Sequence, residues 1–141
     1  MKSKTLINIS TTVNAPVEKV WQHWTNPQAI IKWHTASPDW HTPKAEQELQ
    51  PEGKFSYRME AKDGSFGFDF SGVFDEVKPN NYLEYTLDDG RKVTVNFTSK
   101  GNESYIEQSF EPEKTIPVEM QRGGWQNILD NFKQYVENLK D

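Results

Sequence analysis

Three side chains within a short stretch have the chemistry of metal ligands: His34, Asp39 and His41. Two imidazoles and one carboxylate can hold zinc or iron. Their spacing is not a known ligand pattern, and the segment around them contains prolines rather than the regular structure that usually fixes a metal site. We therefore expect no bound metal, and we expect these side chains to be solvated.

Nothing else in the sequence has the spacing of a catalytic motif. Ser65 stands in Gly64-Ser65-Phe66-Gly67, which lacks the Gly-x-Ser-x-Gly spacing of a nucleophile elbow and falls at an expected turn. Asp69 and Glu107 alternate with the apolar residues of their strands and are expected to face solvent. Cysteine is absent, which excludes a thiolate nucleophile, and no glycine-rich loop precedes a helix to hold phosphate. The sequence predicts no catalytic residue and no cofactor.

Aromatic side chains are the feature that most suggests binding. They make up 13% of the chain and recur at alternate positions of the expected strands and on one face of the last helix. They either pack closely as an ordinary core or line a space for a small molecule, and the pattern leaves both alternatives open. Gln108 and Gln121 are expected to point inward, where a few polar groups would orient a ligand. The complete predicted wall is Trp33, Trp40, Phe55, Tyr57, Met59, Phe68, Phe70, Tyr85, Val95, Phe97, Gln108, Gln121, Trp125 and Leu129.

The elements that would position these residues begin with a strand and two short helices. β-Branched residues predict a strand over 5–13. Apolar spacing from Pro16 to Trp24 predicts a short helix, and residues 30–33 suggest a second. The segment over 34–53 contains three prolines and is expected to be a long surface loop, with Trp33 and Trp40 near the entrance of any cavity.

Alternation of apolar and polar residues predicts five further strands after Gly53, joined by tight turns. From Pro117 onward the apolar period changes from two to 3.6, which predicts a long amphipathic helix. Gly123 and Gly124 within this helix favour a bend, although they would also let a strand or a ligand approach its backbone. The expected fold class is α+β, a six-stranded antiparallel sheet with its apolar face against the C-terminal helix, in one domain over 1–141.

Composition and charge exclude several classes of protein. The formal net charge is −5, with acidic and basic residues interspersed, so nucleic acid is not an expected partner. The first apolar residues are too diluted by polar ones for a signal peptide, and no stretch approaches the roughly 20 apolar residues that span a bilayer. Because the chain also has no cysteine, the expected location is the cytoplasm.

Several short motifs occur in a fixed order along nearly the whole chain. They are Ala15-Pro16-Val17-Glu18-Lys19-Val20-Trp21, Trp24-Thr25-Asn26-Pro27, Lys32-Trp33, Gly53-Lys54-Phe55, Gly72-Val73-Phe74-Asp75-Glu76-Val77 before Pro79, Leu83-Glu84-Tyr85-Thr86, and Gly123-Gly124-Trp125 with Leu129, Phe132 and Tyr135. In this order they resemble the AHSA-like family, named after the activator of heat-shock-protein-ninety ATPase, in the START and birch-pollen-allergen (SRPBCC) superfamily.

The resemblance implies a helix-grip fold, in which the sheet curves around the last helix and many members enclose a cavity with its mouth near the short helices. Members commonly bind lipid-like or aromatic molecules, and some relatives are cyclases. The family has no universal catalytic motif to carry over. The co-chaperone activity of its founding member depends partly on a separate N-terminal domain, which this chain is expected to be too short to include.

The predicted function is therefore to bind a small lipophilic molecule, apolar or aromatic, without catalysis. One alternative is a cyclase or hydrolase that uses the same cavity, with a tyrosine or histidine as acid or base. Another is a regulatory protein that binds a chaperone, for example in a stress response, which would require an exposed apolar patch.

Overall fold

This computed structural model describes residues 6–35 and 37–139. Seven strands and three helices lie within them. The first strand begins at Ile7, and Thr5, where it was expected to begin, lies outside the described residues. In chain order the elements are β1 (Ile7–Val13), α1 (Val17–Thr25), α2 (Pro27–Trp33), β2 (Trp40–Gln47), β3 (Lys54–Ala61), β4 (Gly67–Lys78), β5 (Tyr82–Leu87), β6 (Lys92–Lys100), β7 (Glu103–Phe110) and α3 (Val118–Glu137).

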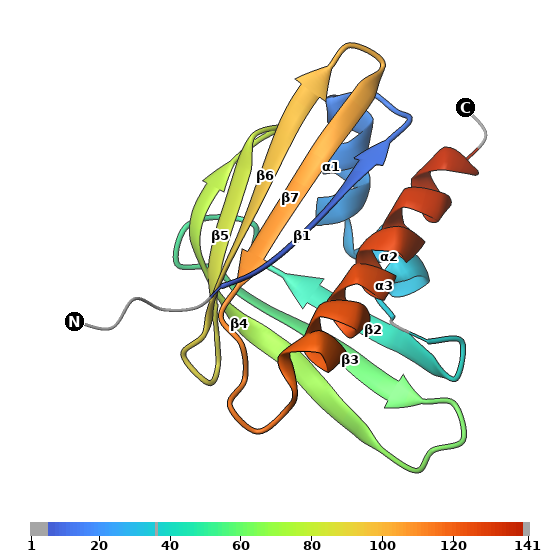
Figure 1. The fold of residues 1–141 in the computed structure, drawn as a ribbon, viewed down its shortest axis with the longest axis vertical. Coiled ribbons are helices and arrows are strands. Elements are labelled where there is room, and N and C mark those ends of the chain that lie inside the picture. The colour runs from blue at the N-terminus through green and yellow to red at the C-terminus, as the bar shows by residue number, and fades with distance from the viewer. Residues whose placement is uncertain (1–5, 36, 140–141) are drawn as a thin grey trace.

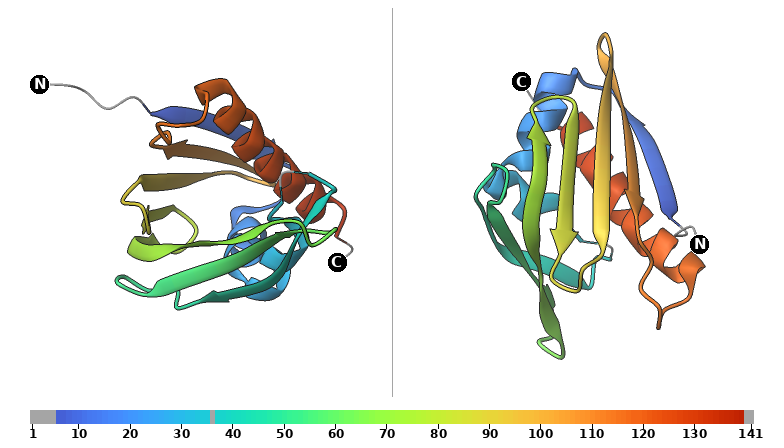
Figure 2. Two further views of the ribbon diagram at one scale, coloured as in Figure 1. Left: turned by 90° about the horizontal axis from the view of Figure 1, so that it is seen from below. Right: turned by 90° about the vertical axis from the view of Figure 1, so that its left-hand side faces the viewer.

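All the strands join one antiparallel sheet in the order β1-β7-β6-β5-β4-β3-β2, so β1 and β2 form its edges. From β2 to β7 each strand pairs with its neighbour in the chain, as tight turns dictate. The sheet curves into an open half-barrel with the helices on its concave side (Figures 1 and 2). The expected α+β class and the long C-terminal helix are confirmed, whereas the expected count of six strands is wrong.

The additional strand is β2, which lies inside the segment expected to be a long loop. Its prolines suggested irregular structure, but an edge strand tolerates Pro43 because one side of it has no partner strand. The pairing of β2 with β3 also shifts register between His41 and Lys44, which is where Pro43 stands. A bulge of this kind accommodates a residue that cannot donate to the ladder.

Two features of β4 account for part of the curvature of the sheet. Its pairing with β5 shifts register between Phe74 and Glu76. Gly72 lies so close to β5 that a Cβ there would stand 2.2 Å from the carbonyl oxygen of Thr86. Bulges and strand glycines increase the local twist and bend of a sheet.

The helices bridge the two edges of the curved sheet. α3 packs beside β1, α2 packs beside β2, and the two helices contact each other. Figure 1 shows α3 crossing the open side of the sheet, with α2 beside its middle. α3 buries one face through Leu129, Phe132 and Val136, as its 3.6-residue period predicts.

The inner side of the sheet is filled unevenly. α1 packs against β6 and β7, and Trp21 and Trp24 meet the ring of Phe97 edge-on at centroid distances of 5.4 and 5.6 Å. Among the described residues, neither β3 nor β4 has a helix packed against it to the same extent. The sheet is therefore close-packed under β6 and less completely covered under β3 and β4.

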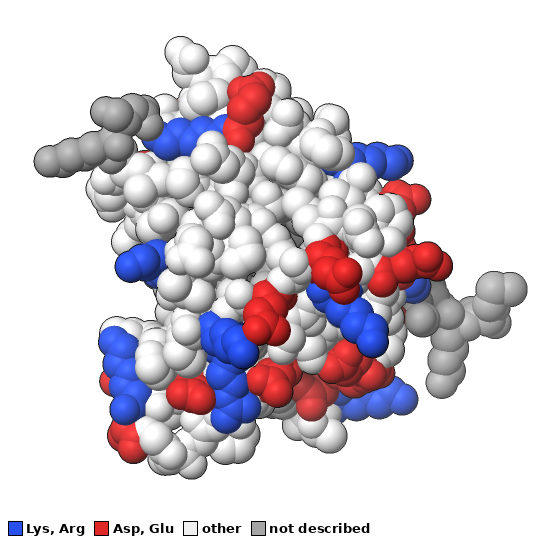
Figure 3. Space-filling model, turned by 180° about the vertical axis from the view of Figure 1, so that it is seen from behind, with Lys and Arg blue, Asp and Glu red and all other residues white. Residues whose placement is uncertain are grey.

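The outer surface carries charges of both signs in alternation. On the side opposite the view of Figure 1, Lys and Arg side chains lie among Asp and Glu side chains (Figure 3). The ion pairs of the strands include Arg58 with Glu60 and Lys44 with Glu46, each at 2.9 Å. Within the described part of the chain, every helix is too short or too polar to cross a bilayer.

Candidate ligand-binding site

A cavity of about 340 Å³ lies between the inner face of the sheet and the helices, in the region under β3, β4 and β5. Its volume is within the range of roughly 300–1,000 Å³ that is usual for ligand sites. Four of the five tryptophans line it, and none of its lining residues is Asp, Glu, Lys or Arg. The lining consists of Trp24, Thr25, Trp33, His34, Ser37, Trp40, Gln47, Leu49, Phe55, Tyr57, Met59, Phe68, Phe70, Phe74, Leu83, Tyr85, Gln108, Gly124, Trp125 and Ile128.

Most of the wall predicted from the sequence lies around this cavity. The predicted residues that line it are Trp33, Trp40, Phe55, Tyr57, Met59, Phe68, Phe70, Tyr85, Gln108 and Trp125. Their rings contact one another across strands: Phe55 lies 5.1 Å from both Phe74 and Tyr85, and Phe70 meets the edge of Trp125 at 5.8 Å. Of the two tryptophans expected near the entrance, Trp33 is only 3% exposed, whereas Trp40 is partly exposed.

Three apolar residues of the predicted wall lie in the close-packed core and do not line the cavity. Val95 and Phe97 are on β6, where α1 covers the sheet, and Leu129 is buried on α3. Alternation predicted correctly that these side chains point inward. It does not predict how closely a helix packs on them.

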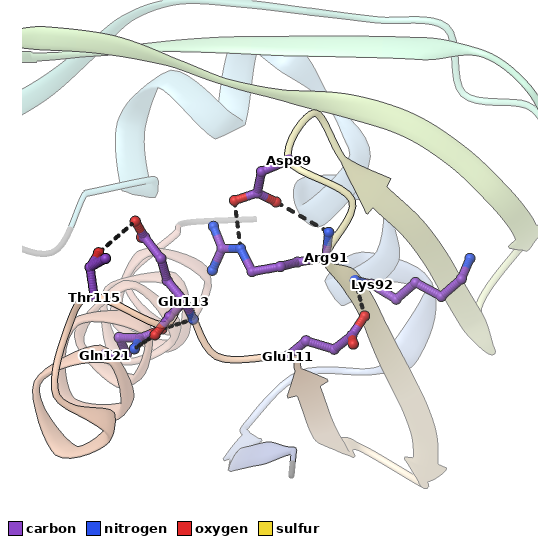
Figure 4. A network of polar contacts seen from close by, with 7 residues as sticks. All are labelled: Asp89, Arg91, Lys92, Glu111, Glu113, Thr115 and Gln121. Atoms are coloured by element: carbon purple, nitrogen blue, oxygen red, sulfur yellow. Dashed lines mark hydrogen bonds and ion pairs between the residues drawn. The ribbon is translucent and has the colours of Figure 1, made fainter. Parts of the chain in front are cut away.

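Gln121 is the fourth predicted residue outside the cavity lining, and its amide has a structural use. Its Nε2 donates to the carbonyl oxygens of Glu113 and Ile116, and its Oε1 accepts from the backbone N–H of Glu113 at 2.7 Å. Figure 4 shows it in a polar network at the loop that leads from β7 into α3. The amide is therefore fully occupied in holding this loop against the first turns of the helix.

His34 is a lining residue that the sequence analysis placed among solvated loop residues, and that expectation is wrong. The side chain is 9% exposed, and its Nδ1 has no hydrogen-bond partner among the described residues. Burial lowers the pKa of the imidazole from 6.5 to about 4, so it is neutral at physiological pH. The rings of Tyr57, Phe70 and Trp33 surround it at centroid distances of 5.2, 5.3 and 5.5 Å.

Helical spacing could have predicted that the side chain of His34 is buried. Ile30, Trp33 and His34 fall at i, i+3 and i+4, which is one face of α2 and its C-cap. On the preceding helix, α1, Trp24 belongs to the buried face and also lines the cavity. Leu83 and Ile128, also absent from the predicted wall, follow the inward pattern of β5 and α3, whereas Leu49 lies in the connection between β2 and β3.

Other polar groups of the lining already have partners. The hydroxyl of Tyr57 donates to Oε1 of Gln47 at 2.7 Å, and Nε2 of Gln47 donates to the carbonyl oxygen of Thr25. Nε2 of Gln108 reaches the hydroxyl of Tyr85 at 3.5 Å, which is long for a hydrogen bond. Burial raises the pKa of both tyrosine hydroxyls, so they stay protonated.

The three side chains first considered as metal ligands do not converge. His34 faces the cavity, whereas His41 is exposed on β2 and lies 3.7 Å from a carboxylate oxygen of Glu60. Within residues 6–35 and 37–139, the structure has no group of three or more histidine and carboxylate side chains placed to hold a metal ion.

Comparisons with known proteins agree with this architecture. A model of the family described as Activator of Hsp90 ATPase homolog 1-like protein matches residues 14–137. The chain belongs to this family, and the expected AHSA-like membership is confirmed. No curated protein matches the sequence.

Several solved structures are similar to the chain over most of its length. The AHSA1-like protein from Aeromonas hydrophila is 41% identical with a TM-score of 0.89, over 94% of this chain and 92% of that one. A protein from Cytophaga hutchinsonii is 52% identical with a TM-score of 0.82, over the same shares of the two chains. A protein from Chromobacterium violaceum, 22% identical with a TM-score of 0.86 over 96% of this chain and 99% of that one, shares the fold.

Proposed function

We propose that the chain binds a small lipophilic molecule, apolar or aromatic, between its curved sheet and α3, in the manner of a helix-grip fold. The observation that supports this most directly is the uncharged, ring-lined cavity of about 340 Å³. This volume is roughly twice the ~150 Å³ that admits benzene, so a ligand of two or three rings matches it. Transfer of such a molecule out of water into an apolar site is favourable.

Binding fits the polar groups of the cavity better than catalysis does. A general acid or base is most effective when its pKa lies near the working pH. His34, with a pKa of about 4, is a weak base, and the raised pKa values of Tyr57 and Tyr85 make them weak acids. These groups suit hydrogen bonding to a ligand rather than proton transfer.

Amide NMR shifts of the ¹⁵N-labelled protein, titrated with flavonoids and fatty acids, test the proposal. We expect the largest shifts at lining residues of β3, β4 and α3. A matched pair of variants on α3 provides the control: Ile128→Trp places a large ring in the cavity, whereas Asn127→Trp places it on the exposed side of the helix. Binding should be lost only in the first, and shifts scattered over the surface would contradict the proposal.

A second candidate, protein binding by a chaperone-associated regulator, is favoured by one observation. Phe66 is 63% exposed and Phe68 is 41% exposed, and both rings lie 5.9 Å from Trp40. Three neighbouring aromatic side chains of this kind can dock on a protein partner. Near-stoichiometric recovery of a chaperone with the wild type, and none with Phe66→Ser, would support this function.

A further inference from the structure

Tyr85 on β5 and Gln108 on β7 form a polar pair on the inner face of the sheet. Both side chains line the cavity, and they are only 8% and 6% exposed. Nε2 of Gln108 lies 3.5 Å from the hydroxyl oxygen of Tyr85, and neither side chain makes another hydrogen bond within the described part of the chain. Buried polar side chains usually use more of their hydrogen-bonding capacity than this.

At least one hydrogen atom of this pair lacks an acceptor among the described residues, whichever way the amide of Gln108 is turned. If Nε2 donates to the hydroxyl of Tyr85, the proton of that hydroxyl is left over. If the amide is reversed, the hydroxyl donates to the amide oxygen, and the NH₂ group is left over. Both orientations therefore offer a free donor, and a group that accepts a hydrogen bond satisfies either one.

The pair can be reached from the cavity. The amide oxygen of Gln108 has no partner, whereas the described structure fully encloses no side-chain oxygen that lacks one. This end of the amide therefore keeps accessible surface. Because the side chain is on the inner face of β7 and lines the cavity, that surface opens into the cavity.

A second tyrosine–glutamine pair in the same cavity shows the contrast. The hydroxyl of Tyr57 donates to Oε1 of Gln47 at 2.7 Å, and Nε2 of Gln47 donates to the carbonyl oxygen of Thr25. Both ends of this amide are bonded within the protein. The pair of Tyr85 and Gln108 is the one that is left open on the cavity side.

The accepting group of the ligand must be uncharged. None of the lining residues is Asp, Glu, Lys or Arg, and the imidazole of His34, with a pKa of about 4, is neutral at physiological pH. A carboxylate in the cavity would lose its hydration without gaining a counter-ion. Among neutral groups, a carbonyl oxygen accepts two hydrogen bonds and brings no proton that would itself need an acceptor.

We infer that the cavity selects an uncharged aromatic carbonyl compound, such as an aryl ketone, and that Tyr85 and Gln108 bind its carbonyl oxygen. A row of aromatic rings begins beside this pair. The ring of Phe55 lies 5.1 Å from that of Tyr85 and 6.1 Å from that of Phe70, between centroids. Phe70 in turn meets the indole of Trp125 at 5.8 Å. The aromatic part of the ligand lies along this row.

This inference rests on the proposed function and adds the chemical class of the ligand to it. Three probes with one ring system test it at pH 7: 2-acetonaphthone, 2-isopropenylnaphthalene, in which a CH₂ group replaces the carbonyl oxygen, and the ionised 2-naphthoate. Calorimetry or tryptophan fluorescence gives the dissociation constant of each. We expect 2-naphthoate to bind at least about tenfold more weakly than the ketone, since it must bury a charge.

The double variant Tyr85→Phe/Gln108→Leu removes both polar groups and keeps the approximate shape of both side chains. It leaves no buried donor without an acceptor, so the fold should be retained. We expect the affinity of the ketone relative to the alkene to fall by about tenfold, because the carbonyl loses its partners. The affinity of the alkene should not fall, which shows that the cavity is intact.

Tyr57→Phe is the matched control, since the hydroxyl it removes already donates to Gln47. It should leave the ratio of the two affinities unchanged. An infrared measurement needs no variant. The carbonyl stretching band of 2-acetonaphthone bound to the wild type should lie at lower wavenumber than in hexane, because a hydrogen bond weakens the C=O bond.

The outcomes separate the inference from the function on which it rests. If none of the three probes binds, both are overturned. If the alkene binds and the double variant does not alter the ratio, or if 2-naphthoate binds most tightly, the inference is overturned while the binding function stands. A carbonyl band of the bound ketone at its position in hexane likewise overturns the inference alone.

Discussion

The indole of Trp125 stacks on the ring of Phe110 at a centroid distance of 3.8 Å and an interplanar angle of 12°. Its edge meets Phe70 at 5.8 Å on β4. Trp125 thus connects α3 to both sides of the curved sheet, because Phe110 is on β7. The same indole forms part of the cavity wall.

Trp125→Ala should therefore weaken both the fold and the site. Loss of a large packed ring costs about 3 kcal/mol of the free energy of unfolding, and urea denaturation measures this. Trp125→Phe keeps a ring on Phe110 and should cost less than half as much. A loss below about 1 kcal/mol in the alanine variant would mean that the stack does not hold α3 in place.

Phe55 and Phe97 form a matched pair that separates the cavity wall from the close-packed core. Both are 4% exposed, but only Phe55 lines the cavity. We expect Phe55→Leu and Phe97→Leu each to lower stability by about 1 kcal/mol. Only Phe55→Leu should alter the affinity for an aromatic probe, and an equal change in both variants would contradict the assignment of β6 to the core.

His34 should make the protein less stable in mild acid. Its pKa is about 4 in the folded chain and 6.5 when unfolded, so between these values only the unfolded chain takes up the proton. The stabilisation is complete above pH 6.5 and is lost as the pH falls towards 4. Between pH 7 and pH 5 the wild type should lose about 2 kcal/mol more than His34→Gln does.

Denaturation at a series of pH values checks this difference. His41→Gln is the control, because it removes an exposed histidine from β2. The stability of His41→Gln should change with pH as that of the wild type does. Parallel pH profiles for the wild type and His34→Gln would show that the imidazole is not buried.

Gly123 and Gly124 differ in their relation to the cavity although both are in α3. A Cβ at either position would meet no atom from elsewhere in the described structure within 4 Å, so no strand requires these glycines. Alanine should stabilise the helix by about 1 kcal/mol at each position. Only Gly124 lines the cavity, so Gly124→Ala alone should weaken binding of a probe that contacts the helix backbone. Equal affinities in the two variants would contradict a role of Gly124 in binding and would favour a bend of the helix as the reason for both glycines.

Local patterns predicted most of the fold. The change of period at Pro117 marked α3, and alternation with tight turns marked β3 to β7, because these signals depend on neighbouring residues alone. β2 was missed because its proline tolerance comes from its edge position, which is a property of the whole sheet.

The site was only partly predictable for a related reason. Alternation places Phe55 and Phe97 on the same inner face, and it cannot distinguish them. What distinguishes them is α1, whose tryptophans fill the space under β6 and leave the space under β3 and β4 open. His34 was missed because it directly follows the last residue of α2 and was assigned to the surface loop, although its spacing from Ile30 already indicated the buried face.

Intermolecular NOEs between 2-naphthol and methyl groups of the protein test the binding account most directly. The account predicts NOEs from the naphthyl protons to Met59, Leu83 and Ile128, which line the cavity. It predicts none to the buried methyl groups of Val95 and Leu129, which do not. NOEs confined to exposed residues such as Met120, or none to the three lining residues at saturating 2-naphthol, would contradict it.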